Sequence, residues 1–310
     1  MTIGAATIGL LGRFALSWLA IVAVSFVLLR VMPGDPIDLF LVQVGTQASP
    51  EVVAAYRTQW GLDEPMTTQF GRWLVGFLTL DWGVSYQTGR PVVADFAGRL
   101  PYSAAIGFGG MATAIVGGFA LGFLATHRPG GVADALSRGL AVAGQAMPAF
   151  AVGLALLWVL GVQLRWIDVF GGGLVERLAL PILLVALFSV GSMARLARAG
   201  LMAVKLSPYY RTALAKGRSP ALALWLHGRG AGALTVLAGL APELAWIVGG
   251  TAVVEIVFGV PGVSERIVDA VAARDYAVLQ PYIALVALWV MGVLSAAALL
   301  QRTIDPRIAP

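Results

Sequence analysis

Long apolar runs separated by shorter polar segments dominate the chain, and six of these runs carry almost no charge. A helix needs about 20 apolar residues to cross the hydrocarbon layer of a bilayer, which is about 30 Å thick. Backbone amides inside lipid must be bonded within the protein, and a helix does this locally. The pattern therefore predicts an all-α, polytopic membrane protein. Its six transmembrane helices are expected at Phe14–Leu29, Leu100–Thr126, Gly139–Leu164, Leu178–Ala194, Gly230–Val254 and Tyr276–Gln301.

A helical periodicity also marks the polar segment between the first two runs. Apolar side chains recur there at i, i+3, i+4, i+7 and i+8, which is the stripe of an amphipathic helix. These side chains are Phe70, Trp73, Leu74, Phe77 and Leu78. Two interpretations stay open, because such a helix either lies on the bilayer surface or forms a shelf for an external partner.

Composition agrees with a membrane protein and excludes several kinds of site. Of the 310 residues, 59% are hydrophobic and 12% are charged, which is more apolar surface than a soluble domain of this length can bury. The chain has no cysteine, so disulfides and thiolate metal sites are excluded.

A cleavable signal peptide is the competing interpretation of the first run. Because Arg30–Pro33 offers no small-residue cleavage site, we expect an uncleaved helix.

Charge is distributed unevenly between the polar segments, and this asymmetry predicts the orientation. Basic residues in short loops stay on the cytoplasmic side. Between the fourth and fifth runs lie seven basic residues and no acid, namely Arg195, Arg198, Lys205, Arg211, Lys216, Arg218 and Arg229. Six spans then place both termini in the cytoplasm, with Arg13, Arg302 and Arg307, and place segment 31–99 with its seven acids outside. Topology thus explains the net charge of +5, and we expect no nucleic-acid partner.

A helix–stop–helix pattern stands out in this basic loop. Ser207-Pro208 and Ser219-Pro220 each pair a capping serine with a proline suited to the first helical position. Gly217 sits where the first helix must end, in a position suited to a left-handed residue. We therefore expect a short helix over Pro208–Lys216, a sharp bend, and a second helix running from Pro220 into the fifth span.

This loop has the form of a docking surface. Ala213 and Gly217 lie four residues apart and predict a small face that another surface can approach closely, while Tyr209, Tyr210 and Arg211 offer aromatic and basic contacts. The alternative is an ordinary positive-inside loop with proline caps. The helix–stop–helix layout favours docking, because retention of topology requires only charge.

The loop and several further motifs also resemble a known family. Arg211-Thr212-Ala213-x-x-x-Gly217 is similar to the "EAA" loop of ABC-importer permeases. The other matching motifs, in order, are MPGDP (Met32–Pro36), LDWGVSY (Leu80–Tyr86), RPV (Arg90–Val92), MPAF (Met147–Phe150), ARLARAGLM (Ala194–Met202), VVEIVFGVPGV (Val253–Val263), RDYAVLQ (Arg274–Gln280) and DPRI (Asp305–Ile308). Together they resemble the first permease subunit of dipeptide, oligopeptide or nickel importers over nearly the whole chain.

The resemblance implies a single permease domain of the type I importer fold over residues 1–310, in the bacterial inner membrane. It implies a second homologous permease, two ATPase subunits that hold ATP and Mg²⁺, and an extracytoplasmic binding protein that delivers cargo to segment 31–99. The ATPases would bind the cytoplasmic coupling loop 195–230 at Tyr209, Tyr210, Arg211, Thr212, Ala213, Lys216 and Gly217. This chain lacks the family's Arg-Asn and proline after His227, so the second half of the loop is expected to be more flexible or to meet a different partner surface.

Catalytic chemistry is not expected on this chain. A phosphate-binding loop would need Gly-Lys-Ser/Thr, and neither Lys205 nor Lys216 lies in such a motif. His127 and His227 lie in separate loops, so we expect no metal site, and no cofactor. An intramembrane enzyme would need paired carboxylates or a Ser/His arrangement within the spans. A self-contained channel is the other alternative, and it would conduct without ATPases.

Three residues within the spans are candidates for the translocation path or its gate. Glu243 is the one acid well inside a predicted span, where a charge costs at least about 2.5–3.5 kcal/mol, so it should face the bundle interior or a water-filled path. A neutral Glu243 bonded to a neighbouring helix is the alternative. Met147 and Met193 could line an adaptable path, although methionines more often fill gaps in helix packing.

Overall fold

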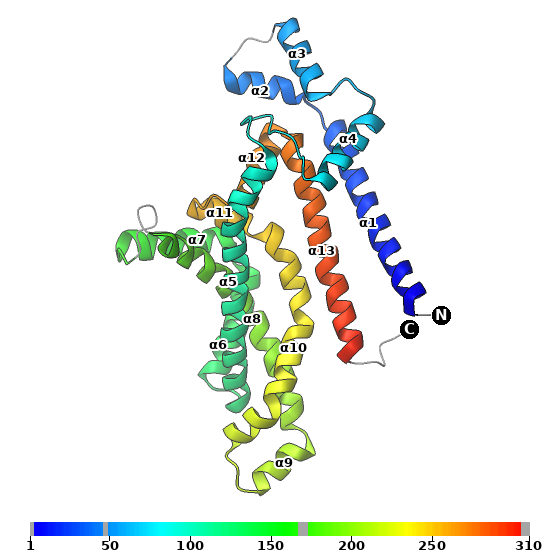
Figure 1. Cartoon of the computed structure of the whole chain (residues 1–310). Coiled ribbons are helices and arrows are strands. Elements are labelled where there is room, and N and C mark those ends of the chain that lie inside the picture. The colour runs from blue at the N-terminus through cyan, green and yellow to red at the C-terminus, as the bar shows by residue number, and fades with distance from the viewer. Residues whose placement is uncertain (1–2, 46–48, 167–172, 305–310) are drawn as a thin grey trace. The chain divides into compact units, whose positions relative to one another are not determined.

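The computed structural model describes residues 3–45, 49–166 and 173–304, which form helices joined by short turns (Figure 1). The helices are α1 (Ile3–Val31), α2 (Pro36–Val44), α3 (Pro50–Trp60), α4 (Met66–Thr79), α5 (Val92–His127), α6 (Val132–Ala146), α7 (Ala149–Leu156), the π-helix η1 (Leu157–Gln163), α8 (Leu174–Lys205), α9 (Pro208–Ala215), α10 (Pro220–Gly250), α11 (Ala252–Phe258), α12 (Val263–Ala273) and α13 (Tyr276–Ile304). Within these residues no strand occurs, and one β-bridge pairs Val84 with Pro91. The all-α prediction is confirmed. Motif Asp305–Ile308 lies outside the described residues.

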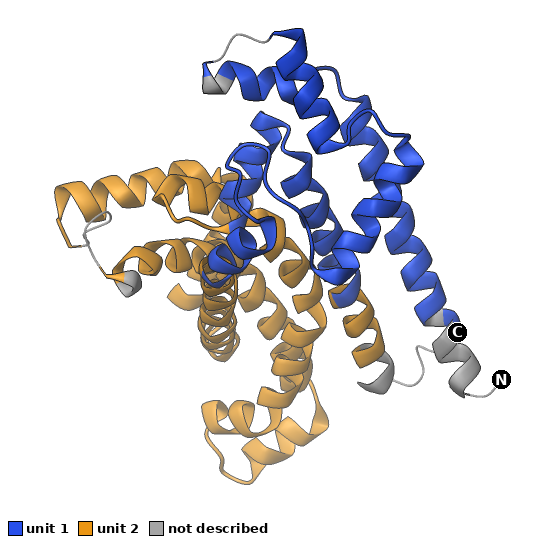
Figure 2. Cartoon of the chain, turned by 45° about the horizontal axis from the view of Figure 1, so that its top comes forward, with its two compact units in different colours: residues 1–101, 263–292 blue, residues 102–262, 293–310 orange. Residues whose placement is uncertain are grey.

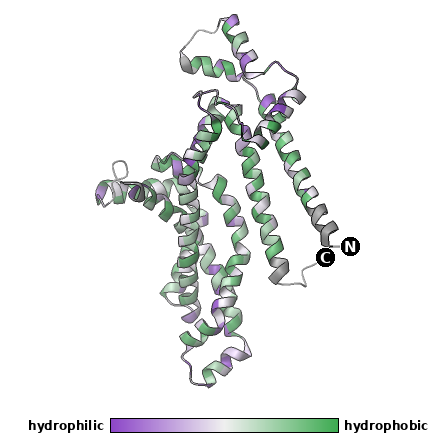
Figure 3. Ribbon diagram, in the orientation of Figure 1, coloured by the Kyte–Doolittle hydropathy of each residue, from purple (hydrophilic) through white to green (hydrophobic). Residues whose placement is uncertain are grey.

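Five of the described helices are long and apolar enough to cross a membrane. The spanning segments are Leu11–Val31, Val92–His127, Glu176–Lys205, Pro220–Gly250 and Tyr276–Leu300, and Figure 3 shows these helices as hydrophobic over most of their length. They correspond to five of the six predicted spans. Most are longer than the apolar run that predicted them, because a helix continues through polar residues wherever its backbone is not interrupted.

The third predicted span is not one continuous helix. α6 and the α7–η1 segment meet at Met147-Pro148 with a bend of 111°. Proline lacks a backbone N–H and disfavours helical backbone at the preceding residue, and Met147 accordingly has extended angles, φ −95° and ψ 134°. The predicted span over Gly139–Leu164 is therefore broken and not one straight helix, but the bent pair together is long and apolar enough to count as a sixth span.

The chain folds into two compact units, and neither is one continuous stretch of sequence (Figure 2). Unit 1 contains residues 1–101 and 263–292, and unit 2 contains residues 102–262 and 293–310. The long helices α5 and α13 each contribute residues to both units.

In unit 1, α4 confirms the predicted amphipathic helix and packs its apolar stripe against the unit's own helices. Phe77 is buried together with Val22 of α1 and Ala284 of α13. The indole Nε1 of Trp18 donates to the backbone oxygen of Ala284 at 2.9 Å. The buried side of the stripe therefore holds unit 1 together, while Leu78 is exposed.

A buried polar network also belongs to unit 1. Arg266 donates to Ser85 Oγ at 2.9 Å, to Asp275 Oδ2 at 3.2 Å and to Gln87 Oε1 at 3.0 Å. Asp275, fully buried, also accepts from Ser85 Oγ at 2.5 Å and from the backbone N–H of Tyr86 at 3.1 Å. Burial raises the pKa of Tyr86 to about 12, so this phenol is neutral beside the ion pair. The network fixes the turn after α4 to α12 and α13.

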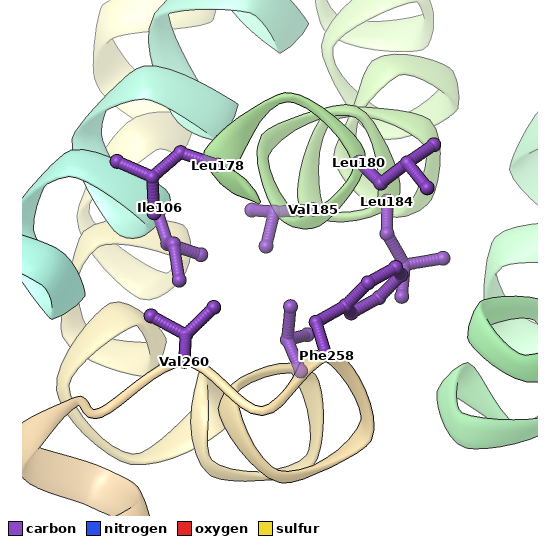
Figure 4. Close-up of a cluster of buried hydrophobic side chains, with 8 residues drawn as sticks. Ile106, Leu178, Leu180, Leu184, Val185, Phe258 and Val260 are labelled. Carbon is purple, nitrogen blue, oxygen red and sulfur yellow. The ribbon is translucent and has the colours of Figure 1, made fainter. Parts of the chain in front are cut away.

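Unit 2 has an apolar core between α5, α8 and α11 (Figure 4). Ile106 of α5, Leu184 and Val185 of α8, and Phe258 of α11 are all almost inaccessible to solvent. The figure shows Val260, just after α11, pointing into the same cluster.

Glycines let α5 and α8 approach each other closely in unit 2. A Cβ atom added at Gly118 would lie 2.4 Å from Met193 Cβ, and one added at Gly122 would lie 2.6 Å from the backbone oxygen of Ala194. Small residues are the usual means by which helices pack tightly in membranes, where no hydrophobic force drives them together.

Candidate functional site

The predicted helix–stop–helix is present between α8 and α10. Ser207 caps α9 by accepting from the backbone N–H of Tyr210 at 3.4 Å, and Ser219 caps α10 by accepting from that of Leu222 at 3.4 Å. In each case proline follows the cap at the first helical position. The two helices are confirmed, with α9 ending at Ala215, one residue before the predicted end.

Gly217 makes the bend between α9 and α10. Its φ is +81°, in the left-handed region that glycine adopts most readily. The N–H of Gly217 donates to the oxygen of Leu214 at 2.9 Å, and that of Arg218 donates to the oxygen of Ala213 at 3.2 Å. This pair of bonds is the Schellman motif, which satisfies carbonyls left open at a helix end.

The two sides of α9 have different surroundings. Tyr210 and Ala213 are buried in a cluster with Leu201 of α8 and with Ala223 and Leu224 of α10. The small Ala213 side chain thus allows α9 to approach the chain's own helices. The other predicted coupling residues, Tyr209, Arg211, Thr212, Lys216 and Gly217, are exposed.

The last turns of α8 are held by ion pairs and a hydrogen bond within unit 2. Asp134 of α6 is almost completely buried and pairs with Arg138 at 2.7 Å and with Arg198 of α8 at 3.3 Å. Lys205 Nζ donates to the backbone oxygen of Thr126, the penultimate residue of α5, at 2.8 Å. These contacts fix the end of α8, from which α9 follows, to α5 and α6.

The exposed side of α9 keeps an uncompensated positive charge. Arg211, Lys216 and Arg218 are exposed, and in the described part of the chain none of them pairs with an acid. A surface of this kind is complementary to an acidic partner surface.

A second candidate site is a cavity of about 270 Å³ within unit 2, called here the Glu243 cavity. Glu243 Oε2 accepts a hydrogen bond from Ser189 Oγ of α8 at 3.1 Å. The described residues that line the cavity are Ala141, Gly144, Gln145, Ala149, Leu184, Val185, Phe188, Ser189, Ser192, Glu243, Trp246 and Val254. The cavity therefore combines one carboxyl group and three neutral polar side chains with apolar and aromatic walls.

Sequence comparisons identify the family. Residues 118–310 match the family described as binding-protein-dependent transport system inner membrane component, and residues 10–107 match its N-terminal family. This chain belongs to that family. The permease resemblance seen in the motifs is thereby confirmed.

Known relatives of this chain are also permeases of transport systems. It is 31% identical to the probable peptide ABC transporter permease protein y4tP of Sinorhizobium fredii over 291 residues, 91% of this chain and 92% of the relative. It is 33% identical to the glutathione transport system permease protein GsiC of Salmonella paratyphi A over 291 residues, 94% of each chain. GsiC of Escherichia coli K12 is 32% identical over 283 residues, 91% of this chain and 92% of the relative. The permease is thus a multi-pass inner-membrane component of an ABC importer, with a transport role.

The three residues predicted for the path lie in different surroundings. Glu243 faces the Glu243 cavity. Met193 is fully buried in a core cluster with Ala114 and Ala197, and Met147 is exposed at the break between α6 and α7. Neither methionine belongs to the cavity lining in the described part of the permease. A role for either in the path stays a prediction.

Sequence reasoning missed the two serines that line the cavity beside Glu243, of which Ser189 is its hydrogen-bond partner. Ser189 and Ser192 lie three residues apart on α8 and both line the cavity. Polar side chains at helical spacing within a span were the signal that could have revealed them. Their proximity to Glu243, 54 residues from Ser189 along the chain, depends on tertiary packing that no local pattern indicates.

Proposed function

We propose that this permease is one of two homologous membrane subunits of an ATP-driven importer of small peptides. An external binding protein delivers the peptide to segment 31–99. Two ATPases bind region 195–230, which runs from the end of α8 through α9 to the start of α10, and the spans open alternately to either side. The observation that carries the proposal is α9, a capped short helix packed on membrane helices on one side and exposed on the other.

The packing beneath α9 supports transmission of force to the spans. Tyr210 and Ala213 contact α8 and α10 together, and these two helices are themselves in close contact. A Cβ added at Gly200 of α8 would lie 2.6 Å from the backbone oxygen of Ala231 of α10. Because such an interior has little free volume, a displacement of α9 moves α8 and α10 with it instead of being absorbed locally.

The exposed side of α9 supplies the contacts for the ATPase. Arg211 and Lys216 provide unpaired positive charge, Tyr209 provides an aromatic surface that is 50% exposed, and Thr212 and Gly217 complete the patch. We expect an acidic surface on the ATPase that binds this patch. In this arrangement the loop and both termini lie in the cytoplasm, as the distribution of basic residues predicts.

The proposed cargo follows the relatives, which are a probable peptide permease and glutathione permeases. Nickel, free or chelated, is the alternative that the wider family resemblance leaves open, and its selection would then fall to the binding protein. Uptake of radiolabelled dipeptides and of radioactive nickel by a deletion strain, with and without the restored gene, separates the two cargoes.

Copurification tests the assembly. With a tag on this chain, we expect untagged ATP-binding subunits and a second permease to copurify, and ATP-dependent peptide uptake to require them together with the binding protein. Arg211→Glu should lower ATPase recovery several-fold, whereas Arg128→Glu, an exposed charge reversal outside the loop, should not. The channel alternative predicts the opposite result, namely conduction by the purified chain alone.

A further inference from the structure

We propose that the Glu243 cavity binds the protonated amino group at the N-terminus of the transported peptide, with Glu243 as its counter-charge. The inference rests on the proposed function, since it concerns a peptide that passes through this permease. It goes further by assigning a site on this chain and a charge requirement for the cargo.

Glu243 differs in its partner from three other acids of the described residues. Asp134 in α6, Asp95 in α5 and Asp275 before α13 each form an ion pair with an arginine. Glu243 lies within α10, a helix that is long and apolar enough to span the membrane. Its one partner in the described part of the chain is the neutral hydroxyl of Ser189. A positive charge stabilises an ionised carboxylate in such a place. No basic side chain is among the described residues that line the cavity, so a bound cation would supply this charge.

The cavity supplies the other groups that an ammonium ion needs. An ammonium group donates three hydrogen bonds, and the carboxylate, the hydroxyl of Ser192 and the amide oxygen of Gln145 are acceptors along the same lining. Ser189 is buried and holds the carboxylate. The aromatic rings of Phe188 and Trp246 lie in the same wall, and ring faces attract organic cations.

The size of the cavity suits the leading end of a small peptide. A cavity of about 150 Å³ in another protein holds a benzene molecule, and the volume here is about 270 Å³. This space accommodates the leading part of a peptide, its amino group and first side chain. Apolar wall residues such as Leu184 and Val185 suit an uncharged first side chain.

The same lining is a poor metal site. Nickel and similar ions prefer several imidazole or thiolate ligands, and hard cations prefer six or more oxygens including several carboxylates. In the described residues no group of three or more His, Cys, Asp or Glu side chains lies close enough to hold a metal. A single carboxylate among hydroxyls and aromatic rings fits an organic cation better.

One proline break between helices and one proline inside a continuous helix adjoin the cavity, and both fit a transport site. Gly144, Gln145 and Ala149 flank the bend at Met147-Pro148, and Pro242 lies inside α10 directly before Glu243. Binding sites in transporters are typically built where spanning helices are interrupted, because the backbone there can change shape.

Binding to the purified complex tests the inference without the binding protein. The probes are radiolabelled alanyl-alanine and propionyl-alanine, which has the same skeleton without the amino group. We expect the wild-type complex to bind alanyl-alanine at least about tenfold more tightly, as for one charge-assisted hydrogen bond. Glu243→Gln should remove this preference, Glu243→Asp should retain part of it, and the matched variant Glu176→Gln, in an exposed position outside the cavity, should leave it unchanged.

Several results would overturn the inference. Equal binding of the two probes by the wild-type complex does so whether or not any variant folds. An unchanged preference in Glu243→Gln also does so, because it means that Glu243 does not provide the counter-charge. Loss of the second permease from the Glu243→Gln complex would instead assign the counter-charge to that subunit. If the wild-type complex shows no ATP-dependent dipeptide uptake, the proposed function itself is refuted. This result can be told apart from the three results above, which concern probe binding and subunit assembly.

Discussion

At the scale of single residues, glycines in this permease serve two different physical purposes. Gly217 has a left-handed backbone, and nothing lies within 4 Å of where its Cβ would be, so its importance is conformational. Gly118 has helical backbone, but a Cβ there would lie 2.4 Å from that of Met193, so its importance is steric. The two kinds respond to different substitutions.

Gly217→Val should strain the bend after α9 by about 1–2 kcal/mol, because a β-branched residue disfavours the left-handed region. We expect several-fold weaker peptide-stimulated ATP hydrolysis by the purified complex, with membrane insertion unchanged. Gly217→Asn is the matched control, since asparagine tolerates this backbone, and it should keep most of the activity. Equal ATPase activity of the Gly217→Val and wild-type complexes would show that the bend has no part in the coupling mechanism.

Gly118→Ala should lower the thermal stability of the purified complex, because overpacking a tight contact costs about 1–3 kcal/mol. Gly117→Ala adds the same methyl group one residue earlier, where the nearest side-chain atom would be 3.5 Å away, and should be neutral or slightly stabilising. Thermal unfolding of both variants in detergent checks the pair. Matching midpoints would contradict the close approach of α5 and α8.

At the scale of elements, local sequence signals predicted where helices begin and end. The contacts that these helices make through tertiary packing could not be predicted. Serine-proline pairs and Gly217 identified α9 within one residue of its observed end, because capping is decided by neighbours in sequence. Met147-Pro148 carried an equally local signal for a helix break, but the apolar run on both sides was interpreted as one span. Which side of α9 is buried, and which helices cover the stripe of α4, depend on residues far away in the chain. Sequence alone could not reveal these contacts.

The buried side of α9 gives a prediction for the element as a whole. Ala213→Leu adds three carbon atoms to a filled cluster and should push α9 away from α8 and α10, reducing peptide-stimulated ATP hydrolysis several-fold. Ala215→Leu makes the same change at an exposed position of α9 and should have little effect on stability. ATPase copurification, measured on the same samples, separates lost docking from lost transmission. Wild-type coupling in Ala213→Leu would refute the role of this contact.

At the scale of the whole molecule, the predicted orientation can be tested without background, because the chain has no cysteine. In intact cells a membrane-impermeant maleimide should label Thr88→Cys, in the segment predicted to lie outside, and not Lys216→Cys. Both positions are exposed. Lys216→Cys should react once the membrane is opened. Labelling of Lys216→Cys in intact cells would show that the orientation is the reverse of the predicted one, and that α9 is not a cytoplasmic docking site.

The polar network of unit 1 also determines when this unit can be completed during synthesis. Ser85 and Asp275 are separated by 190 residues, and ribosomes add about 5–20 residues per second, so the earlier residue waits roughly 10–40 s for its partner. Throughout that interval the turn after α4 has no buried arginine or aspartate to fix it. A nascent chain stalled before α12 would therefore carry an unfinished turn, without the partners that hold it in the complete protein.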